Sequence, residues 1–166
     1  DEPSDDPLVK IAENLNIGCF RGSLLNVMER ISLASKHFNS DIIVELLGDN
    51  PLVDPKLIDD VISFYLNGNY DYVATASKDY SYLNYFKNKK NLFPLGIRVQ
   101  VYSREVAEQY IYFRGNSEEL GTKHPCSFIY ENPQKFKIGF FEAVGEWASI
   151  RKPDINFAVN YKDDFK

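Results

Sequence analysis

The stretch Asp41-Ile-Ile-Val-Glu-Leu-Leu-Gly-Asp-Asn-Pro-Leu-Val-Asp54 decides the fold that this chain is expected to adopt. Its first half is a nearly continuous apolar run, which is typical of a strand buried on both faces of a parallel sheet. Gly48-Asp-Asn-Pro51 ends that strand, and Asp54-Pro55 supplies an N-cap and a first-turn proline for a helix. The stretch therefore predicts a central β-strand followed by an α-helix.

Asp49 lies just past the carboxyl end of this predicted strand, where open α/β sheets bind their ligands. A carboxylate beside a glycine at that place is suited to hold a divalent cation that bridges phosphate oxygens. The alternative is a turn aspartate whose side chain caps local backbone N–H groups. The residues of this stretch leave both interpretations open.

The composition is that of a globular protein, with 44% hydrophobic and 26% charged residues among 166. A formal charge of −5 argues against a nucleic-acid-binding surface, which needs a basic face. No apolar run approaches the roughly 20 residues of a membrane span, so we expect no membrane partner. Cys19 and Cys126 lie far apart without metal-ligand spacing, which favours a reduced, cytoplasmic protein.

Strands and helices alternate along the first half of the chain, with short connections between them. This order predicts an α/β fold with a mostly parallel, doubly wound sheet. The predicted strands cover residues 17–20, 42–47 and 70–76. The helices between them start near Ser23, as N-cap, and Pro55, and Asn67-Gly-Asn69 ends the second of them.

The second half of the chain predicts a small antiparallel region. Residues 97–102 alternate between apolar and polar, which predicts a half-buried strand with Arg98 and Gln100 on its polar face. Residues 136–143 predict a strand that is antiparallel if it pairs with this one. Residues 155–159 predict a last strand that ends at Asn160.

Polar groups recur where the predicted strands end or the predicted helices begin. The free N–H groups at the start of the helix after Ser23 are suited to receive an anion or the edge of a base. Taken singly, such residues have structural explanations, because Arg21 fits a surface arginine and His124 fits a helix-start histidine. The positions concerned are Arg21-Gly22-Ser23, Gly48-Asp49, His124 and Asn160.

Taken in order, these residues resemble the cytidylyltransferases of surface-sugar synthesis. The resemblance is closest to the spore-coat polysaccharide type, and the CMP-Kdo and CMP-acylneuraminate synthetases are more distant. It covers essentially the whole chain and rests on Ser4-Asp-Asp-Pro-Leu8, Phe20-Arg-Gly-Ser23, Gly48-Asp49 with Pro51 and Asp54, Pro94-Leu-Gly96, His124, and Phe128-Ile-Tyr-Glu-Asn-Pro133.

The resemblance implies a Rossmann-like, mostly parallel sheet of the nucleotidyltransferase type with a small antiparallel region. It implies transfer of CMP from CTP to a sugar acid, with release of pyrophosphate, in cell-surface polysaccharide biosynthesis. It also implies a homodimer whose interface, together with substrate contacts, lies within residues 78–143. In this family Mg²⁺ assists the reaction, and the corresponding ligands here would be Asp49 and Asn160.

The resemblance also assigns a role to each candidate residue. Asp49 would be the catalytic residue that holds the metal. The fork of an arginine suits the carboxylate of a sugar acid, because it binds bidentately. By resemblance, the nucleotide would be bound by Arg21, Gly22, Ser23 and Gly48, and the sugar by Arg98, Gln100 and His124.

Some features depart from the family pattern. No segment matches the glycine-rich basic loop that cradles the triphosphate, so we expect residues 1–166 to be a truncated single domain without full activity in isolation. Asn160 stands where the family usually has aspartate, and Arg98 and Gln100 stand where acidic residues are frequent. The open alternatives are a glycosyltransferase that uses a nucleotide-sugar and a catalytically impaired module that binds a nucleotide or sugar.

Overall fold

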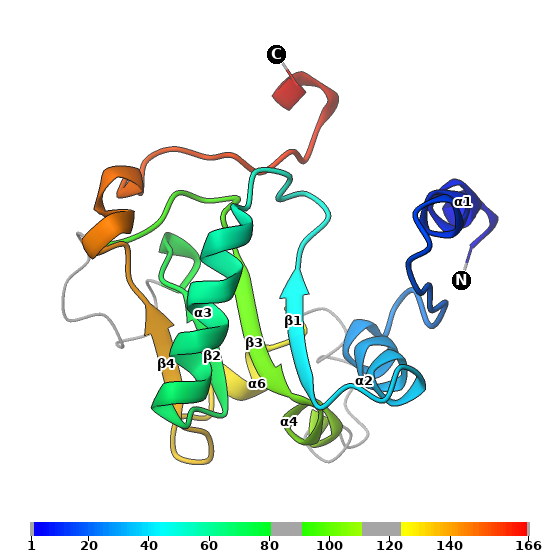
Figure 1. The fold of residues 1–166 in the computed structure, drawn as a ribbon, viewed down its shortest axis with the longest axis horizontal. Coiled ribbons are helices and arrows are strands. Elements are labelled where there is room, and N and C mark those ends of the chain that lie inside the picture. The colour runs from blue at the N-terminus through cyan, green and yellow to red at the C-terminus, as the bar shows by residue number, and fades with distance from the viewer. Residues whose placement is uncertain (1, 81–90, 111–123, 166) are drawn as a thin grey trace. The chain divides into compact units, whose positions relative to one another are not determined.

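A four-stranded sheet with the strand order β1-β3-β2-β4 is the framework of the fold (Figure 1). β2 pairs with β4 in parallel and with β3 antiparallel, which confirms an α/β fold with both kinds of pairing. The computed structural model describes residues 2–80, 91–110 and 124–165. The strands are β1 (Ile42–Leu46), β2 (Tyr72–Thr75), β3 (Val99–Ser103) and β4 (Ile138–Phe141).

The chain divides into two compact units. The first comprises Asp1–Ile43 and Ser103–Phe128, and the second comprises Val44–Tyr102 and Ile129–Lys166. This division does not test the expectation of a single domain over residues 1–166, which stays a prediction. Among the described residues, no helix has the length and apolar character that crossing a membrane requires.

The hydrophobic core of the second unit lies between the sheet and α3 (Pro55–Gly68), which covers one face of the sheet (Figure 1). Leu57, Val61 and Tyr65 of α3 are buried against Val73 of β2 and Val101 of β3. Full burial of such a side chain contributes roughly 1.5–3 kcal/mol, so this contact holds the helix on the sheet. The unit also contains the short 3₁₀ helices η2 (Lys78–Tyr80), η4 (Gly145–Ile150) and η5 (Lys162–Phe165).

α3 begins and ends where the sequence predicted. The side chain of Asp54 accepts a hydrogen bond from the backbone N–H of Lys56 at 2.8 Å, and Pro55 occupies the first turn. Asn69 ends the helix in the left-handed conformation, with φ 49° and ψ 51°. Both ends are confirmed because caps act through neighbouring residues alone.

The prediction of β1 as a central strand buried on both faces is wrong. β1 stands at the end of the strand order, and its residues Ile42 and Leu46 are 38% and 44% exposed. An apolar run indicates that a strand needs cover. It does not specify the neighbours, because strand order depends on pairing between segments far apart in the chain.

The prediction of a half-buried strand at residues 97–102 is also wrong. β3 lies inside the sheet order, and Gln100 and Tyr102 are 0% exposed. The side-chain oxygen of each residue has an internal partner instead. The hydroxyl of Tyr72 donates to Gln100 Oε1 at 2.6 Å, and the hydroxyl of Tyr102 donates to Glu45 Oε2 at 2.7 Å. The polar positions of this alternating strand therefore face a buried hydrogen-bonded layer.

Other predicted strands are altered or absent. β4 pairs with β2 and does not form the antiparallel pair with β3 that was considered. Residues 155–159 form only one parallel bridge, between Asn156 and Leu95. Residues 17–20 carry no strand hydrogen bonding in the structure. Of the predicted dimer region 78–143, segments 81–90 and 111–123 lie outside the described residues, so the homodimer stays a prediction.

The first unit is mainly helical. Asn26, not Ser23, is the N-cap of α2, and its side chain accepts from the backbone N–H of Glu29 at 3.2 Å. Ser23 Oγ instead accepts from the backbone N–H of Asn26 at 3.0 Å, which places the predicted cap one turn too early. The helices in the described part of this unit are η1 (Pro3–Asp5), α1 (Asp6–Asn14), α2 (Val27–His37) and α4 (Arg104–Glu108), and α6 (Ser127–Tyr130) spans the boundary of the units.

A charged cluster joins α3 to η4 in the second unit. Lys56 Nζ donates to Asp60 Oδ2 and to Glu146 Oε1, at 2.8 Å in each case. Trp147 Nε1 donates to the same oxygen of Asp60 at 2.9 Å. The hydrogen bond from Lys56, followed by the one from Trp147, lowers the pKa of Asp60 below its ordinary value.

We expect the lowered pKa of Asp60 to make the fold acid-sensitive. A carboxyl group with a lowered folded-state pKa stabilises the fold above its ordinary pKa of about 3.9, and this contribution disappears as the pH falls through the folded-state pKa. Asp60→Asn should lower the thermal unfolding midpoint at pH 7 and weaken the fall of that midpoint below pH 5. Circular dichroism melts from pH 2 to 7 measure this. Asp59→Asn, an exposed neighbour on α3, is the control and should keep the wild-type acid profile.

Candidate functional site

A polar cavity of about 200 Å³ lies in the second unit, beyond the carboxyl end of β1. It is lined by the loop after β1, by the segment that leads into β3, by Asp79 of η2 and by the C-terminal segment. The lining residues are Leu47, Asp49, Asn50, Asp79, Leu95, Gly96, Arg98, Asn156, Ala158 and Asn160.

Backbone hydrogen bonds hold the lining segments of this cavity together. Val159 N–H donates to the carbonyl of Asp49 at 2.8 Å, which fixes the C-terminal segment beside the loop after β1. The backbone of Leu95 exchanges hydrogen bonds with the same segment. Its N–H donates to the carbonyl of Ile155 at 3.0 Å, and its carbonyl accepts from Phe157 N–H at 2.8 Å.

Gly96 makes this close approach possible. Its φ is 81°, which lies in the left-handed region, and a Cβ at this position would come within 2.1 Å of the backbone N of Ala158. A side chain would therefore displace the C-terminal segment from the cavity wall. The sequence marked this glycine through Pro94-Leu-Gly96, although it did not indicate what the glycine contacts.

The carboxylate of Asp49 is held by its neighbour. Asn50 Nδ2 donates to Asp49 Oδ1 at 2.7 Å, and Asn50 Oδ1 accepts from the backbone N–H of Arg98 at 3.0 Å. Within the described residues, the hydrogen bond to the Asp49 side chain thus comes from a side-chain amide and not from a local backbone N–H. The alternative of Asp49 as a simple turn cap is not what the structure shows.

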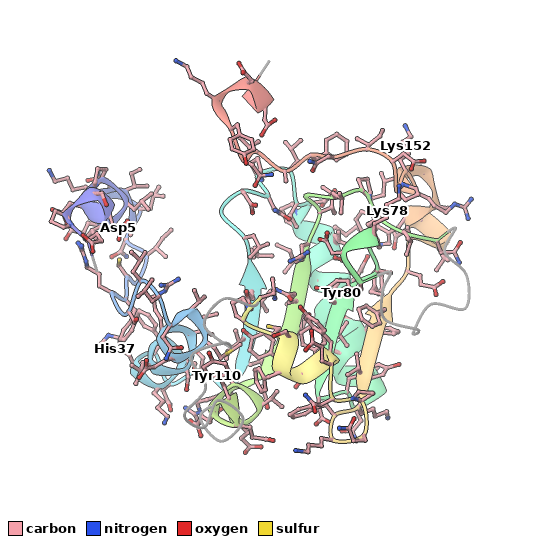
Figure 2. The ribbon with its side chains drawn as sticks, turned by 180° about the vertical axis from the view of Figure 1, so that it is seen from behind. Asp5, His37, Lys78, Tyr80, Tyr110 and Lys152 are labelled. Carbon is pink, nitrogen blue, oxygen red and sulfur yellow. The ribbon has the colours of Figure 1, made fainter. Side chains whose placement is uncertain are left out.

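Arg98 supplies a cation to the cavity wall. Its side chain is 14% exposed, and its guanidinium donates to the carboxylate of Asp79. The guanidinium also lies over the ring of Tyr80, 5.4 Å from the ring centroid. Figure 2 shows Lys78 and Tyr80 of η2 beside the sheet. Stacking and pairing together stabilise a largely desolvated arginine next to the cavity.

Asn160 lines the same cavity as Asp49. Its backbone N–H donates to Asp164 Oδ2 at 2.7 Å, so η5 fixes the backbone that carries this side chain. Over residues 2–80, 91–110 and 124–165, no group of three or more His, Cys, Asp or Glu is arranged to hold a metal. Asp49 and Asn160 therefore fit Mg²⁺ only in the way common at nucleotide sites, with few protein ligands plus waters and phosphate oxygens.

Gln100 does not face this cavity, so the prediction that its side chain faces a sugar must be corrected. It is 0% exposed, and its Oε1 accepts from the hydroxyls of Tyr72 at 2.6 Å and Tyr80 at 3.2 Å. The alternation of residues 97–102 assigned Gln100 to a solvent-facing side, but the interior position of β3 buries both sides.

The predicted nucleotide residues Arg21 and Gly22 line a different cavity, of about 290 Å³, in the first unit. Arg21 donates to Asp6 Oδ1 and to the carbonyl of Glu2, at 2.6 Å in each case. Ser23 adjoins them in the chain and accepts from the backbone of Asn26.

His124 also belongs to the first unit, and its Nδ1 accepts from the backbone N–H of Cys126 at 3.3 Å, which fits the helix-start explanation. Within the second unit, the structure brings together the predicted site residues Asp49, Arg98 and Asn160, with Gly48 adjoining Asp49 in the chain.

Sequence reasoning missed Asn50 and Asp79, both of which line the cavity. Asn50 follows Asp49 directly and is only 8% exposed, and an asparagine between an apolar strand and a proline is the one signal that pointed to it. Asp79 had no comparable signal, because its importance comes from its contact with Arg98, 19 residues further along the chain.

The sequence and the fold were compared with those of known proteins. The model of a family described as Cytidylyltransferase matches residues 1–162. The chain is 30% identical over 162 residues to an uncharacterized protein of Methanocaldococcus jannaschii, covering 98% of this chain and 58% of that protein. It is 25% identical over 166 residues to the spore coat polysaccharide biosynthesis protein SpsF of Bacillus subtilis, covering 100% of this chain and 61% of SpsF.

The fold is similar to that of a cytidylyltransferase from Leptospira borgpetersenii, with a TM-score of 0.77 at 23% sequence identity. The match covers 99% of this chain and 62% of that structure, and it confirms the predicted fold class. The chain thus spans about three fifths of the length of these relatives, since the matches cover 58%, 61% and 62% of their chains.

We expect Gly96→Ala to damage the cavity. The left-handed backbone costs alanine about 1–2 kcal/mol, and the contact with Ala158 adds a further cost. Gly145→Ala is the matched control, because Gly145 also has a positive φ, of 59°, but a Cβ there meets nothing within 4 Å. Urea unfolding should show a larger loss for Gly96→Ala, and only this variant should weaken ligand binding in the cavity. Equal losses would contradict the steric role of Gly96.

Proposed function

The chain belongs to the cytidylyltransferase family, and from this premise we propose that the protein transfers CMP from CTP to a sugar acid and releases pyrophosphate. The observation that supports this proposal most is the cavity that joins the carboxylate of Asp49 to the guanidinium of Arg98. A carboxylate beyond a strand end suits the phosphate side of the reaction. A nearby arginine suits an anionic acceptor.

Cell-surface polysaccharide biosynthesis is the pathway that we propose for this reaction. It is supported by the similarity to SpsF, a spore coat polysaccharide biosynthesis protein, whose 25% identity extends over the whole chain. We also propose a homodimer, with its interface within residues 78–143, on the basis of the family resemblance.

On the phosphate side, Asp49 and Asn160 would hold Mg²⁺ together with oxygens of the triphosphate. When bound, the ion neutralises phosphate charge during attack of the sugar hydroxyl on the α-phosphorus. Asp49 is pre-oriented for this task by the hydrogen bond from Asn50. Gly48 leaves open space beside it, because a Cβ there would meet nothing within 4 Å.

The base and ribose of CTP would contact Arg21, Gly22 and Ser23. Support for this assignment comes from the family motif and from the cavity in the first unit that Arg21 and Gly22 line. The cavity already contains the cationic side chain of Arg30, and its wall includes the apolar Leu8. A mixed polar and apolar wall suits a nucleoside, which has polar edges and an apolar face.

On the sugar side, we assign Arg98 to the carboxylate of the sugar acid and keep His124 as a proposed contact. The planar fork of arginine binds a carboxylate through two parallel hydrogen bonds. Asp79 and Tyr80 hold the guanidinium in one place before a ligand arrives, which reduces the entropy lost on binding.

A nucleotide-binding module without turnover is the second candidate. It is favoured by the neutral side chain of Asn160, which is a weaker Mg²⁺ ligand than a carboxylate.

A nucleotide titration tests the proposed function. CTP should bind in preference to ATP, GTP and UTP, its binding should depend on Mg²⁺, and Asp49→Ala should weaken it at least about tenfold, which corresponds to 1.4 kcal/mol. Isothermal titration calorimetry measures these affinities, and Asp59→Ala on the exposed side of α3 is the control. CTP binding without turnover would favour the module. Absence of nucleotide binding would refute both candidates.

A kinetic prediction concerns Arg98. Because only the arginine fork binds a carboxylate bidentately, Arg98→Lys should raise the KM for the sugar acid about tenfold and leave the KM for CTP within about twofold. Steady-state assays of pyrophosphate release measure both constants. Arg104→Lys is the control, since Arg104 also pairs with an aspartate, Asp41, at 3.3 Å, but does not line the cavity. A parallel rise in both KM values would argue against the assignment.

A further inference from the structure

We propose, on the basis of the function proposed above, that Asn50 is the positioning residue of this site. Its amide fixes the carboxylate of Asp49 and the backbone of Arg98 in one geometry. Asn50 thereby links the side of the cavity assigned to phosphate with the side assigned to the sugar acid.

Two hydrogen bonds and the burial of the side chain define this role. Asn50 Nδ2 lies 2.7 Å from Asp49 Oδ1, and Asn50 Oδ1 lies 3.0 Å from the backbone N of Arg98. Asn50 is 8% exposed, so little water competes for either hydrogen bond. Both bonds join groups of the second unit, and Asp49, Asn50 and Arg98 all line the cavity.

The two partners determine the orientation of the amide. A carboxylate oxygen only accepts hydrogen bonds, and a backbone N–H only donates them. The amide must therefore direct its NH₂ to Asp49 and its carbonyl to Arg98, because the flipped orientation would oppose like groups at both ends. A side chain here needs one donor and one acceptor at the reach of asparagine. Aspartate supplies no donor when ionised, and alanine supplies neither group.

The turn itself does not require this amide. The backbone N–H of Asn50 donates to the carbonyl of Leu47 at 3.0 Å, which closes the turn, and Pro51 restricts the backbone that follows. The side chain acts on functional groups instead. It engages one oxygen of the Asp49 carboxylate, whose two oxygens offer about four acceptor positions, so ligand-binding capacity remains.

Holding the carboxylate before the ligand arrives is a form of preorganisation. An Asp49 side chain without this contact would sample several rotamers, and ligand binding would have to select one of them. The same amide restrains the N–H of Arg98, so a shift at one side of the cavity is transmitted to the other. The hydrogen bond from Val159 to the carbonyl of Asp49 extends this restraint to the residue before Asn160.

The test uses Asn50→Ala and Asn50→Asp in the purified protein. Asn50→Ala removes both hydrogen bonds. Asn50→Asp keeps an acceptor for the N–H of Arg98 but brings a second carboxylate to within hydrogen-bonding distance of Asp49. The second carboxylate repels that of Asp49 at the place where the amide of Asn50 had held it.

The control is Asn91, another asparagine of the second unit whose amide both donates and accepts. Its Nδ2 donates to Glu142 Oε2 at 2.8 Å, and its Oδ1 accepts from Arg151 at 3.2 Å, but it does not line the cavity. Asn91→Asp therefore brings two carboxylates together in the same way, away from the cavity. Asn91→Ala matches the loss of two hydrogen bonds.

Two measurements read out the role of Asn50. Calorimetric titration with CTP and Mg²⁺ at a single pH should show affinity about tenfold weaker for Asn50→Ala. It should also be weaker for Asn50→Asp, while both Asn91 variants keep the wild-type affinity. Hydrogen exchange should be about tenfold faster at the Arg98 amide in Asn50→Ala and near the wild-type rate in Asn50→Asp.

The outcomes separate this inference from the proposed function. If Asn50→Ala binds CTP like the wild type while Asp49→Ala does not, the proposed function stands and the positioning role of Asn50 is refuted. If Asp49→Ala binds CTP like the wild type, the proposed function fails and the inference fails with it. Should Asn50→Ala not fold, the CTP affinity of Asn50→Asp decides, and an affinity equal to that of the wild type refutes the inference.

Discussion

The position of β3 between β1 and β2 is the constraint on which the rest of the second unit depends. Because β3 runs antiparallel to β2, its first residues lie beside the last residues of β2. Arg98, which directly precedes β3, therefore lines the cavity. Both faces of β3 are covered, since Val99 to Tyr102 are 0% exposed, so its polar side chains need internal partners. Gln100 Oε1 accepts from the hydroxyl of Tyr72, and the hydroxyl of Tyr102 donates to Glu45, which stabilises this register of the sheet.

The cavity forms because loops of distant origin converge at one end of this sheet. Gly96 lets the C-terminal segment approach the backbone before β3, and Asp49 holds that segment through its carbonyl. The result is a wall with a carboxylate and a guanidinium, each held by its own neighbours. Arg98 is restrained by Asp79 and Tyr80, and Asp49 is restrained by Asn50, so opposite charges coexist in the wall.

Local chemistry was predictable from the sequence, and long-range arrangement was not. Asp54 and Asn69 were identified correctly as the ends of α3, because a cap acts on backbone groups within one turn. Asp49 was placed correctly beyond a strand end by the abrupt change from apolar to turn residues. Gln100 was misassigned, since alternation shows that two faces differ but does not show what covers each face.

The sequence by itself determined the α/β class, the ends of α3 and the family, because caps, apolar periodicity and motif order act over short distances or survive as residue identities. Only the tertiary structure decided that β1 ends the strand order, that Gln100 is buried, and that Asn50 joins Asp49 to Arg98. The physical reason is that each of these depends on which distant segments pair. Pairing is governed by the packing of the whole sheet, which no local pattern encodes.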